Sequence, residues 1–508
     1  MPESESNVPE VPRQGPTVLA PTRTESFWLV RLYRRLMPRA LRSRVARLVA
    51  PEVRNRVILR AAAGGPLRRL RNKIAHMWLR TRHPMLIQGR ILVREGGRIR
   101  IAVAGDDISP LQVRRTTLDL VCDALTAGAV PFFCVRSFED TGSTVAVSAA
   151  DRDRAIDALE AACTPAAAYV GPASGDTDEQ RAGLGPRAWK AVAGMPVIRI
   201  VQYHCSPQGS LMLGRPYGCS VEFWKPQGEE LVAPRPNRMA TSIPLNGEIV
   251  AVPEEAFTRL APAAASARQY PTRSEFIGTL VDDVPFPVDV VYTWVDGSDA
   301  AWQIRRDTAL GVVDAGTLNE QAANDARYIS RDELRYSLRS LAMYAPWVRH
   351  IWIVTDSQVP VWLDISHPKV TVVDHKEIFG DRGALPTFNS HAIESQLHHI
   401  DGLAEHFLYF NDDVFLGRPV IPGDFFLSNG MTKFFLSKAQ VSLSQRSVAD
   451  MPVLAAGKNN RKLIEETFGH VLIQKMKHVP SPLRRSLLAE IEERFPEESA
   501  ETARHQFR

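Results

Sequence analysis

The chain has 508 residues, of which 44% are hydrophobic and 23% charged, and its formal net charge is +5. This length exceeds what one ordinary hydrophobic core holds together, and the composition excludes a disordered or membrane-embedded protein, so we expect two or more globular domains. No run of about 18 apolar residues is present, which argues against a membrane-spanning helix. The acidic, Pro-containing start does not resemble a signal peptide, and we expect a cytoplasmic protein.

The N-terminal part of the chain is predicted to contain two segments. Residues 1–25 are polar and contain several Pro, and we expect them to be disordered. Residues 26–84 are predicted to be an Arg-rich helical segment, because fifteen Lys or Arg and a single acidic residue lie between Arg31 and Arg80. Such an Arg-rich face is either simply solvated or docks on an anionic lipid or polymer. Peripheral contact with the inner face of a membrane through this segment is the membrane alternative, and a solvated face is the other.

Residues 85–280 are predicted to form an accessory α/β domain. Apolar runs and alternating patterns predict helices and strands in alternation: strands near 91–93, 99–104 and 130–135, and helices near 111–127 and 151–163. The five cysteines also lie here, and none of them forms a CxxC pair. We expect buried, reduced thiols. No chemical motif assigns a function to this region.

A linker near 261–285 is predicted to precede a third region, residues 287–508, in which the pattern is clearer. Strands are predicted at 288–295, 350–355 and 370–374, and from His406 onward. A capping box, Ser330 to Glu333, predicts the start of a helix. Further helices are predicted near 390–403, 459–475 and 482–494. Strands separated by helices imply parallel crossovers and a doubly wound sheet.

Carboxylates follow four of these predicted strands. They are Asp296, Asp356, Asp374 and the adjacent pair Asp412 and Asp413. A single Asp after a strand is usually a turn residue or a cap, but several at one edge of a parallel sheet predict a ligand site. Two adjacent carboxylates raise each other's pKa unless a cation is present. Mg²⁺ or Mn²⁺ with a substrate diphosphate is the cation chemistry that such a pair suits, and it is what a nucleotide-sugar enzyme requires.

The segment from Leu385 to Glu394 is the second candidate. Pro386 with Asn389 or Ser390 suits a helix start. Spacing would then place on one helix face His391, Glu394 and His398. This stripe is either a polar rim or supplies a general base or a substrate-orienting group; a zinc site stays open, although the spacing is not that of HExxH.

Two segments near the end of the chain could contribute further polar groups. His478 precedes Val479 and Pro480, and the chain closes with an Arg504-His-Gln-Phe-Arg508 segment. His478 and Arg508 would suit proton transfer and phosphate neutralisation. A His before a Pro is, however, more often a structural residue.

At these residues the chain resembles the Stealth family, which includes bacterial capsule and exopolysaccharide sugar-phosphotransferases and the animal N-acetylglucosamine-1-phosphotransferase. The first family region is similar to Asp289-Val-Val-Tyr-Thr-Trp-Val-Asp-Gly-Ser-Asp299. The second is similar to the block from Arg331 to Phe415, which contains Leu385-Pro-Thr-Phe388 and Asn411-Asp-Asp413. The third is similar to Lys475 to Glu498. The resemblance covers residues 287–508.

The resemblance implies transfer of hexose- or N-acetylhexosamine-1-phosphate from a UDP-sugar to the hydroxyl of a polysaccharide or glycan acceptor, with release of UMP, in exopolysaccharide or capsule synthesis. It implies a mostly parallel, Rossmann-like (glycosyltransferase-A-like) catalytic sheet with flanking helices. Asp412 and Asp413 are the expected ligands of Mg²⁺ or Mn²⁺. The expected catalytic residues are Glu394, His478, Arg508 and His391, and the expected substrate-binding residues are Trp294, Asp296, Arg335, Asp356 and Asn411. The family's fourth region continues beyond its His-x-x-Arg to an acidic residue, so we expect this chain to be a fragment or to lack part of the site.

Two alternatives remain open at this point. The same carboxylates would serve a metal-dependent glycosyltransferase that forms a glycosidic bond. A non-catalytic polysaccharide- or polyanion-binding protein would instead use the Arg-rich segment as its working surface. A nucleic-acid binder is not expected, because the basic region lacks interleaved stacking aromatics and a known fold signature.

Overall fold

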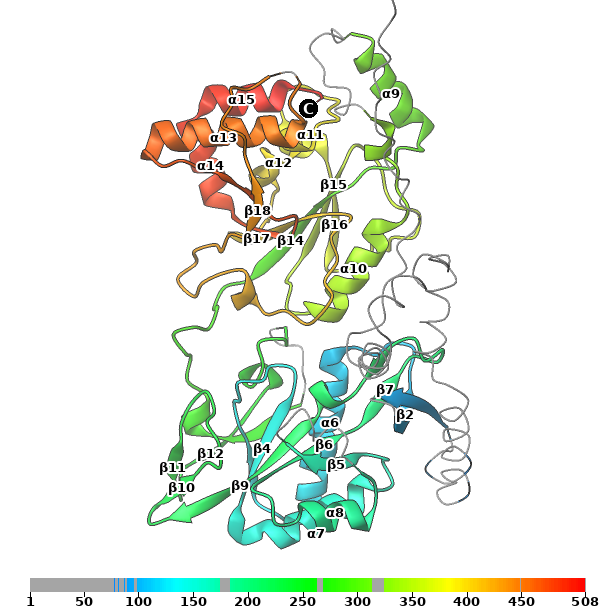
Figure 1. The fold of residues 1–508 in the computed structure, drawn as a ribbon, viewed down its shortest axis with the longest axis vertical. Coiled ribbons are helices and arrows are strands. Elements are labelled where there is room, and N and C mark those ends of the chain that lie inside the picture. Colours follow the sequence, from blue (N-terminus) through cyan, green and yellow to red (C-terminus); the bar gives the residue numbers. More distant parts are fainter. Residues whose placement is uncertain are drawn as a thin grey trace, which may run out of the picture. The chain divides into compact units, whose positions relative to one another are not determined.

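The computed structural model describes residues 77, 81, 86, 89–95, 98–173, 183–262, 268–312, 324–447 and 449–507 (Figure 1). The predicted disordered segment 1–25, nearly all of the Arg-rich segment 26–84, and Arg508 lie outside these residues. The chain forms two compact units, Met1–Val103 and Ala104–Arg508. In the described ranges, no helix combines the length and the apolar character needed to cross a bilayer.

The described part of the first unit is an antiparallel hairpin. Strand β1 (Arg90–Glu95) pairs with β2 (Arg98–Ala104), and Arg90 lies opposite Val103. Both strands match the predicted positions. The predicted limits of the accessory and catalytic domains stay a prediction.

A mixed sheet forms the core of residues 104–280. Its strands run in the order β11-β10-β9-β4-β3-β13-β12, and β6 joins β5 to β9. The strands β4 and β9 pair in parallel, as do β3 and β13, whereas the other pairs are antiparallel. Their bounds are β3 (Phe132–Cys134), β4 (Ser143–Ser148), β5 (Tyr169–Pro172), β6 (Val197–Val201), β9 (Cys219–Gln227), β10 (Glu230–Val232), β11 (Ser242–Pro244), β12 (Ile249–Val252) and β13 (Tyr270–Arg273). Strand β13 lies inside the segment 261–285, so the prediction of a linker there was wrong for these residues.

Three helices accompany this sheet: α6 (Pro110–Ala127), α7 (Arg152–Cys163) and α8 (Pro186–Val192). Helix α6 begins after Ser109, whose hydroxyl accepts a hydrogen bond from the Gln112 N–H and so caps the helix. The first two helices were predicted at nearly these bounds. All five cysteines are buried and unbridged, which confirms the prediction that they are buried.

A buried ion cluster fastens α6 to the turn η4 (Glu254–Ala256). The Glu254 side chain is 0% exposed, and its two oxygens accept hydrogen bonds from Arg114 Nη1 at 2.6 Å and Arg115 Nε at 2.8 Å. Arg114 also donates through Nε to the Gly142 carbonyl at 3.0 Å. Each buried charge therefore has a partner, which buried charges require.

A second sheet, with strand order β16-β15-β14-β17-β20, organises residues 287–507. Four strands are parallel: β14 (Val288–Thr293), β15 (Ile351–Thr355), β16 (Val370–Asp374) and β17 (His406–Asn411). Strand β20 (Ser481–Arg484) pairs antiparallel with β17. The mixed α/β architecture with a mostly parallel sheet is therefore confirmed, and a closer likeness to glycosyltransferase folds stays a prediction.

Helices cover both faces of this second sheet, because alternate side chains of each strand point to opposite sides. On one face, Val290 and Tyr292 of β14 pack with Leu334 and Leu341 of α10 (Glu333–Tyr344). On the other face, Val291 packs with α11 (His375–Phe379) and α12 (Ser390–Glu394). This arrangement explains why the strands read as continuous apolar runs.

Strand register brings the carboxyl ends of the parallel strands to one level. Thr293 lies opposite Asn411 of β17 and Val354 of β15, and Thr355 lies opposite Asp374. The residues that follow these strands therefore lie along a single edge of the sheet.

Several helix predictions need correction. Helix α10 starts at Glu333 rather than from a Ser330 cap; its N-cap is Asp332, at φ 64° and without a side-chain capping bond. Helix α12 ends at Glu394 and is followed by the short 3-10 helix η8 (Leu397–His399), so one continuous helix over 390–403 is wrong. Helix α13 (Pro452–Phe468) lies earlier than predicted. Helix α14 (Arg485–Arg494) was predicted, and α15 (Pro496–Arg504) was not.

Three further elements complete this region. Helix α9 (Ala300–Leu310) is capped by Asp299, whose side chain accepts from the Ala301 and Trp302 N–H groups. Strands β18 (Leu436–Gln440) and β19 (Gln474–Met476) form a small antiparallel pair before His478.

Candidate functional site

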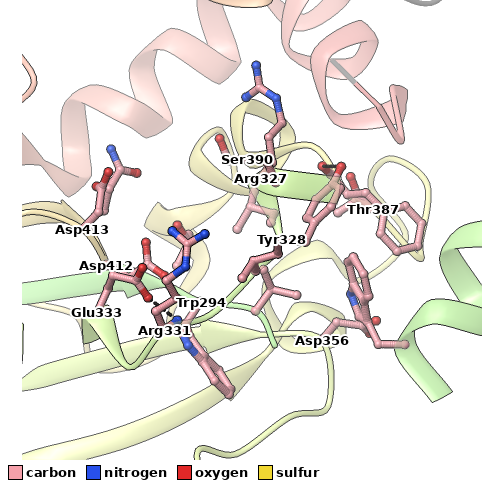
Figure 2. A pocket seen from close by; sticks show the side chains of 18 of the residues that line it. Trp294, Arg327, Tyr328, Arg331, Glu333, Asp356, Thr387, Ser390, Asp412 and Asp413 are labelled. Atoms are coloured by element: carbon pink, nitrogen blue, oxygen red, sulfur yellow. Dashed lines mark hydrogen bonds between the residues drawn. The ribbon is translucent and has the colours of Figure 1, made fainter. Parts of the chain in front are cut away.

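A cavity of about 500 Å³ opens at the carboxyl edge of the parallel sheet (Figure 2). Open α/β sheets bind ligands at this edge. Each strand or helix that reaches the edge contributes to the lining. The strands contribute Thr293 at the end of β14, Asp356 after β15, and Asn411 at the end of β17 with Asp412 and Asp413 after it. The other polar lining residues include Arg327, Arg331, Glu333, His375, Thr387, Ser390 and His478.

Three carboxylates gather on one side of this cavity: Asp412, Asp413 and Glu333. Figure 2 shows Asp412 and Glu333 side by side, with Arg331 close to them. Burial, together with the charges of Asp413 and Glu333, raises the pKa of Asp412 to about 6. Like charges that disfavour each other's ionisation create a site for a cation, and carboxylate oxygens are the donors that Mg²⁺ and Mn²⁺ prefer. These carboxylates are of the chemical type that the expected metal prefers, and the metal itself stays a prediction.

His478 and Asp413 form a hydrogen-bonded pair at the cavity. The Nε2 atom of His478 lies 3.0 Å from Asp413 Oδ1, and its Nδ1 atom lies 3.4 Å from Asn411 Nδ2. Because the Asn411 amide donates to Nδ1, the proton of a neutral imidazole is assigned to Nε2, which donates to Asp413. Asp413 thus fixes the orientation of the imidazole and leaves the lone pair of Nδ1 on the other side of the ring.

Hydrogen bonds continue from this pair to Glu394. The Tyr409 hydroxyl lies 3.1 Å from Asn411 Oδ1 and 3.2 Å from Glu394 Oε1. The Ser390 hydroxyl also donates to Glu394 Oε1, at 3.1 Å. Glu394 is not among the residues that line the cavity, so it reaches the site through Tyr409 and Ser390 rather than directly.

An aromatic wall closes another side of the cavity. The Trp302 ring lies 5.0 Å from Tyr328 and 5.3 Å from Phe388, measured between ring centroids. Phe507 stacks on Phe388 at 5.1 Å, and the Phe388 N–H donates to the Gln506 carbonyl. Predicted catalytic Arg508 follows Phe507 and lies outside the described residues. An apolar wall opposite charged groups is what a ligand with a ring and a phosphate requires.

Asp356 and His375 contribute differently from each other. The Asp356 carboxylate accepts two hydrogen bonds from Arg305 of α9, from Nε at 2.9 Å and from Nη2 at 2.7 Å. It therefore anchors α9 beside the cavity. His375 is 4% exposed, and burial lowers its pKa to about 4. It is thus a neutral imidazole near pH 7, and its buried Nδ1 has no hydrogen-bond partner among the described residues.

The cavity brings together six of the predicted site residues: Trp294, Asp356, Asn411, Asp412, Asp413 and His478. Their chemical roles stay predictions. Four other predicted residues are not among the lining residues: Asp296, Arg335, His391 and Glu394.

The local contacts explain these four positions. Asp296 Oδ1 accepts from the N–H and the hydroxyl of Ser298, so this carboxylate closes a turn. The Arg335 guanidinium lies over Trp362, 5.9 Å from the ring centroid. The predicted common face of His391, Glu394 and His398 does not form, because α12 ends at Glu394.

Sequence reasoning missed several lining residues. Arg331 and Glu333 were part of the segment interpreted as a capping box; in the structure the Glu333 carboxylate accepts the Arg331 N–H at 2.5 Å. His375 directly follows Asp374, which was recognised as a strand end, and its position could have been inferred from that signal. Arg327 and Tyr328 precede a helix and carry no comparable signal.

Models of the Stealth protein conserved regions match the chain in three places: region 1 at residues 286–311, region 2 at 327–434 and region 3 at 477–508. The chain is 46% identical over 507 residues to the exopolysaccharide phosphotransferase SCO6023 of Streptomyces coelicolor, covering 95% of this chain and 83% of that protein. It is 44% identical over 510 residues to SCO2594 of the same organism, covering 94% and 83%. It is 33% identical over 426 residues to the exopolysaccharide phosphotransferase CpsY of Mycobacterium tuberculosis, covering 82% and 75%.

Proposed function

The chain belongs to the Stealth family, and we propose that it transfers a sugar 1-phosphate from a nucleotide sugar to a carbohydrate hydroxyl in exopolysaccharide synthesis. It is a phosphotransferase enzyme, as the names of its relatives indicate. The proposed donor is a UDP-hexose or UDP-N-acetylhexosamine, and the proposed leaving group is UMP. One observation carries the proposal: a single cavity brings the carboxylate cluster together with the Asp413–His478 pair.

The proposed reaction forms one bond to phosphorus and breaks another. The oxygen of the acceptor hydroxyl attacks the β-phosphorus of the donor. The bond from that phosphorus to the bridging oxygen breaks, and UMP leaves with the electron pair. The bond between the sugar and its own phosphate oxygen is untouched, so the anomeric configuration is retained. Positioning and neutralisation of phosphoryl charge supply most of the catalysis in reactions of this class.

His478 is the proposed general base. It lines the cavity, and its Nε2–H is held by Asp413, so Nδ1 is the atom that takes the proton of the acceptor hydroxyl. The 3.4 Å contact between Nδ1 and Asn411 is long, and the hydroxyl would replace it. Asp413 then stabilises the imidazolium that forms.

Glu394 is the proposed positioning residue. Glu394 Oε1 and Asn411 Oδ1 both lie within reach of the single Tyr409 hydroxyl hydrogen, so Glu394 decides whether Tyr409 donates to the amide next to His478. Between the two candidate bases, the geometry supports His478, because Glu394 does not line the cavity.

The donor diphosphate needs positive charge around it. Asp412 and Asp413, with Glu333 beside them, would hold Mg²⁺ or Mn²⁺, which supplies charge neutralisation for the diphosphate when bound. Arg327 and Arg331 lie at the same cavity and offer guanidinium groups, which pair well with phosphate oxygens. Arg508 is proposed for the same task from its place in the family pattern.

A panel of UDP-sugars, incubated with the protein, a glycan acceptor and Mg²⁺ or Mn²⁺, tests the reaction. The expected product is UMP together with a phosphodiester. His478→Ala should reduce turnover by about 10²- to 10⁴-fold, the usual contribution of general acid–base catalysis. Glu394→Gln should cost less, because Glu394 acts through Tyr409. Near-normal turnover in a folded His478→Ala variant would contradict this assignment of the base.

A metal-dependent glycosyltransferase is the second candidate, because the same carboxylates and cavity would serve it. It would release UDP and form a glycosidic bond, so the nucleotide released distinguishes the two reactions. Peripheral membrane contact through residues 26–84 is supported by the charge of that segment alone. Co-sedimentation with anionic vesicles, but not with neutral ones, would be expected from it.

A further inference from the structure

A second cluster of metal-ligating side chains is formed by His398, His399 and Glu492. The two histidines belong to the 3-10 helix η8, and Glu492 belongs to α14. The Nε2 atom of His398 lies 2.6 Å from Glu492 Oε2, and that of His399 lies 3.0 Å from the same oxygen. Within the described residues, these side chains offer three ligand atoms that all lie within 4.8 Å of one another.

Two imidazole rings converge on a single carboxylate oxygen, Glu492 Oε2. A single negative charge can balance only one imidazolium, and Arg485 donates to the His398 carbonyl at 3.0 Å, which adds positive charge nearby. Two imidazole nitrogens and one carboxylate oxygen at these separations are donors that a divalent cation can share in place of protons.

We propose that His398, His399 and Glu492 bind a Zn²⁺ ion. Two histidines and one glutamate are an established ligand set for zinc, with water or another small ligand in the fourth position. The imidazole and carboxylate donors distinguish this site from the carboxylate cluster at Asp412, whose oxygen donors suit Mg²⁺ or Mn²⁺.

The proposed ion would connect two parts of the chain that are distant in sequence. His398 and His399 lie in the segment matched by conserved region 2, and Glu492 lies in that matched by region 3. Helix α14 directly follows β20, which His478 precedes. A Zn²⁺ ion between η8 and α14 would therefore hold the C-terminal segment that carries His478 against the sheet. None of the three ligands is among the residues that line the cavity at the edge of the sheet, so the proposed ion would lie outside that site.

Zinc binding to the chelator-treated full chain tests the proposal, measured by equilibrium dialysis and by the Zn²⁺ dependence of the Tm. The measurement is made in an Asp412→Asn, Asp413→Asn background, which removes the other proposed metal site. We expect one Zn²⁺ per chain and a Tm that rises with Zn²⁺, as for any ligand that binds only the folded state. In that background, His399→Gln and Glu492→Gln should each weaken binding at least about tenfold and abolish the rise in Tm.

His470→Gln provides the matched control, because His470 is exposed and follows α13. His470→Gln should leave the Zn²⁺-binding isotherm unchanged. His399 and Glu492 are both partly exposed, so their substitution is compatible with folding, and circular dichroism checks this. Absence of Zn²⁺ binding in the background, or an isotherm that neither His399→Gln nor Glu492→Gln changes, would reduce the cluster to an ion pair and overturn the proposal.

Discussion

Replacement of Asp412 by Asn should stabilise the metal-free protein at neutral and alkaline pH, although it removes a proposed metal ligand. The folded-state pKa of Asp412 is raised from the ordinary 3.8 to about 6 by burial and by the charges of Asp413 and Glu333. Its ionised carboxylate is therefore disfavoured in the folded state. Ionisation of Asp412 therefore lowers the free energy of unfolding. This loss of stability is absent below the unfolded-state pKa and complete above the folded-state pKa.

The magnitude follows from the difference between the two pKa values. A shift from 3.8 to about 6 is roughly two units, and at about 1.4 kcal/mol per unit this corresponds to about 3 kcal/mol. Asp412→Asn carries no charge and avoids this cost. We therefore expect the variant to be more stable by about 3 kcal/mol near pH 8, with the difference declining between about pH 6 and pH 4.

Scanning calorimetry in the presence of a chelator measures this difference as a shift of several degrees in the Tm of the transition that contains the site. Asp401→Asn is the matched control, because Asp401 is exposed in the turn after η8. Added Mg²⁺ or Mn²⁺ should raise the Tm of the unsubstituted protein, which would bring its Tm closer to that of Asp412→Asn. A variant that is less stable than the parent near pH 8, or a difference that does not change with pH, would refute the reasoning.

Three further substitutions follow from the contacts of single residues. Tyr409→Phe removes the hydroxyl between Glu394 and the amide beside His478. We expect kcat to fall about tenfold and the pH profile of kcat to shift, while the Tm changes little. An unchanged pH profile would show that Tyr409 does not position the base. Gly297→Ala would place a Cβ 2.4 Å from the Tyr328 carbonyl oxygen, so the aromatic wall must move and the KM for the donor should rise; an unchanged KM would contradict this. Glu254→Gln leaves the buried Arg114 and the half-buried Arg115 without their counter-charge and should cost about 3–5 kcal/mol of stability, measured by denaturation.

The parallel sheet could be predicted from the sequence because its strands are buried on both faces. Strand β16 was predicted at its observed bounds, β14 and β15 within two residues of theirs, and β17 at its observed start. The carboxylates after them then had to share one edge. Prediction failed where local patterns compete with tertiary contacts. The apolar and polar spacing after Ser390 suits a long helix, yet the chain turns after Glu394 so that η8 can pack against α14.

The site was predicted where residues follow strands, and less well where loops supply them. Asp412, Asp413 and His478 do meet in the cavity, but the aromatic wall combines Trp302, Tyr328 and Phe388 from three segments that no local pattern connects. Asp296 had the same strand-end signal as Asp412 and instead closes a turn. A carboxylate after a strand can line the ligand site or close a turn. Asp296 closes a turn because the neighbouring Ser298 supplies two hydrogen-bond donors to it.

The position of the β-phosphorus after one turnover tests the central claim most directly. A UDP-sugar that carries a labelled β-phosphorus is incubated with the protein, a glycan acceptor and Mg²⁺ or Mn²⁺, and the nucleotide and carbohydrate fractions are separated. Transfer of a sugar 1-phosphate predicts that the label moves to the carbohydrate in a phosphodiester and that the nucleotide product is unlabelled UMP. Label that stays with the nucleotide, as UDP, while the sugar alone reaches the acceptor would contradict the account.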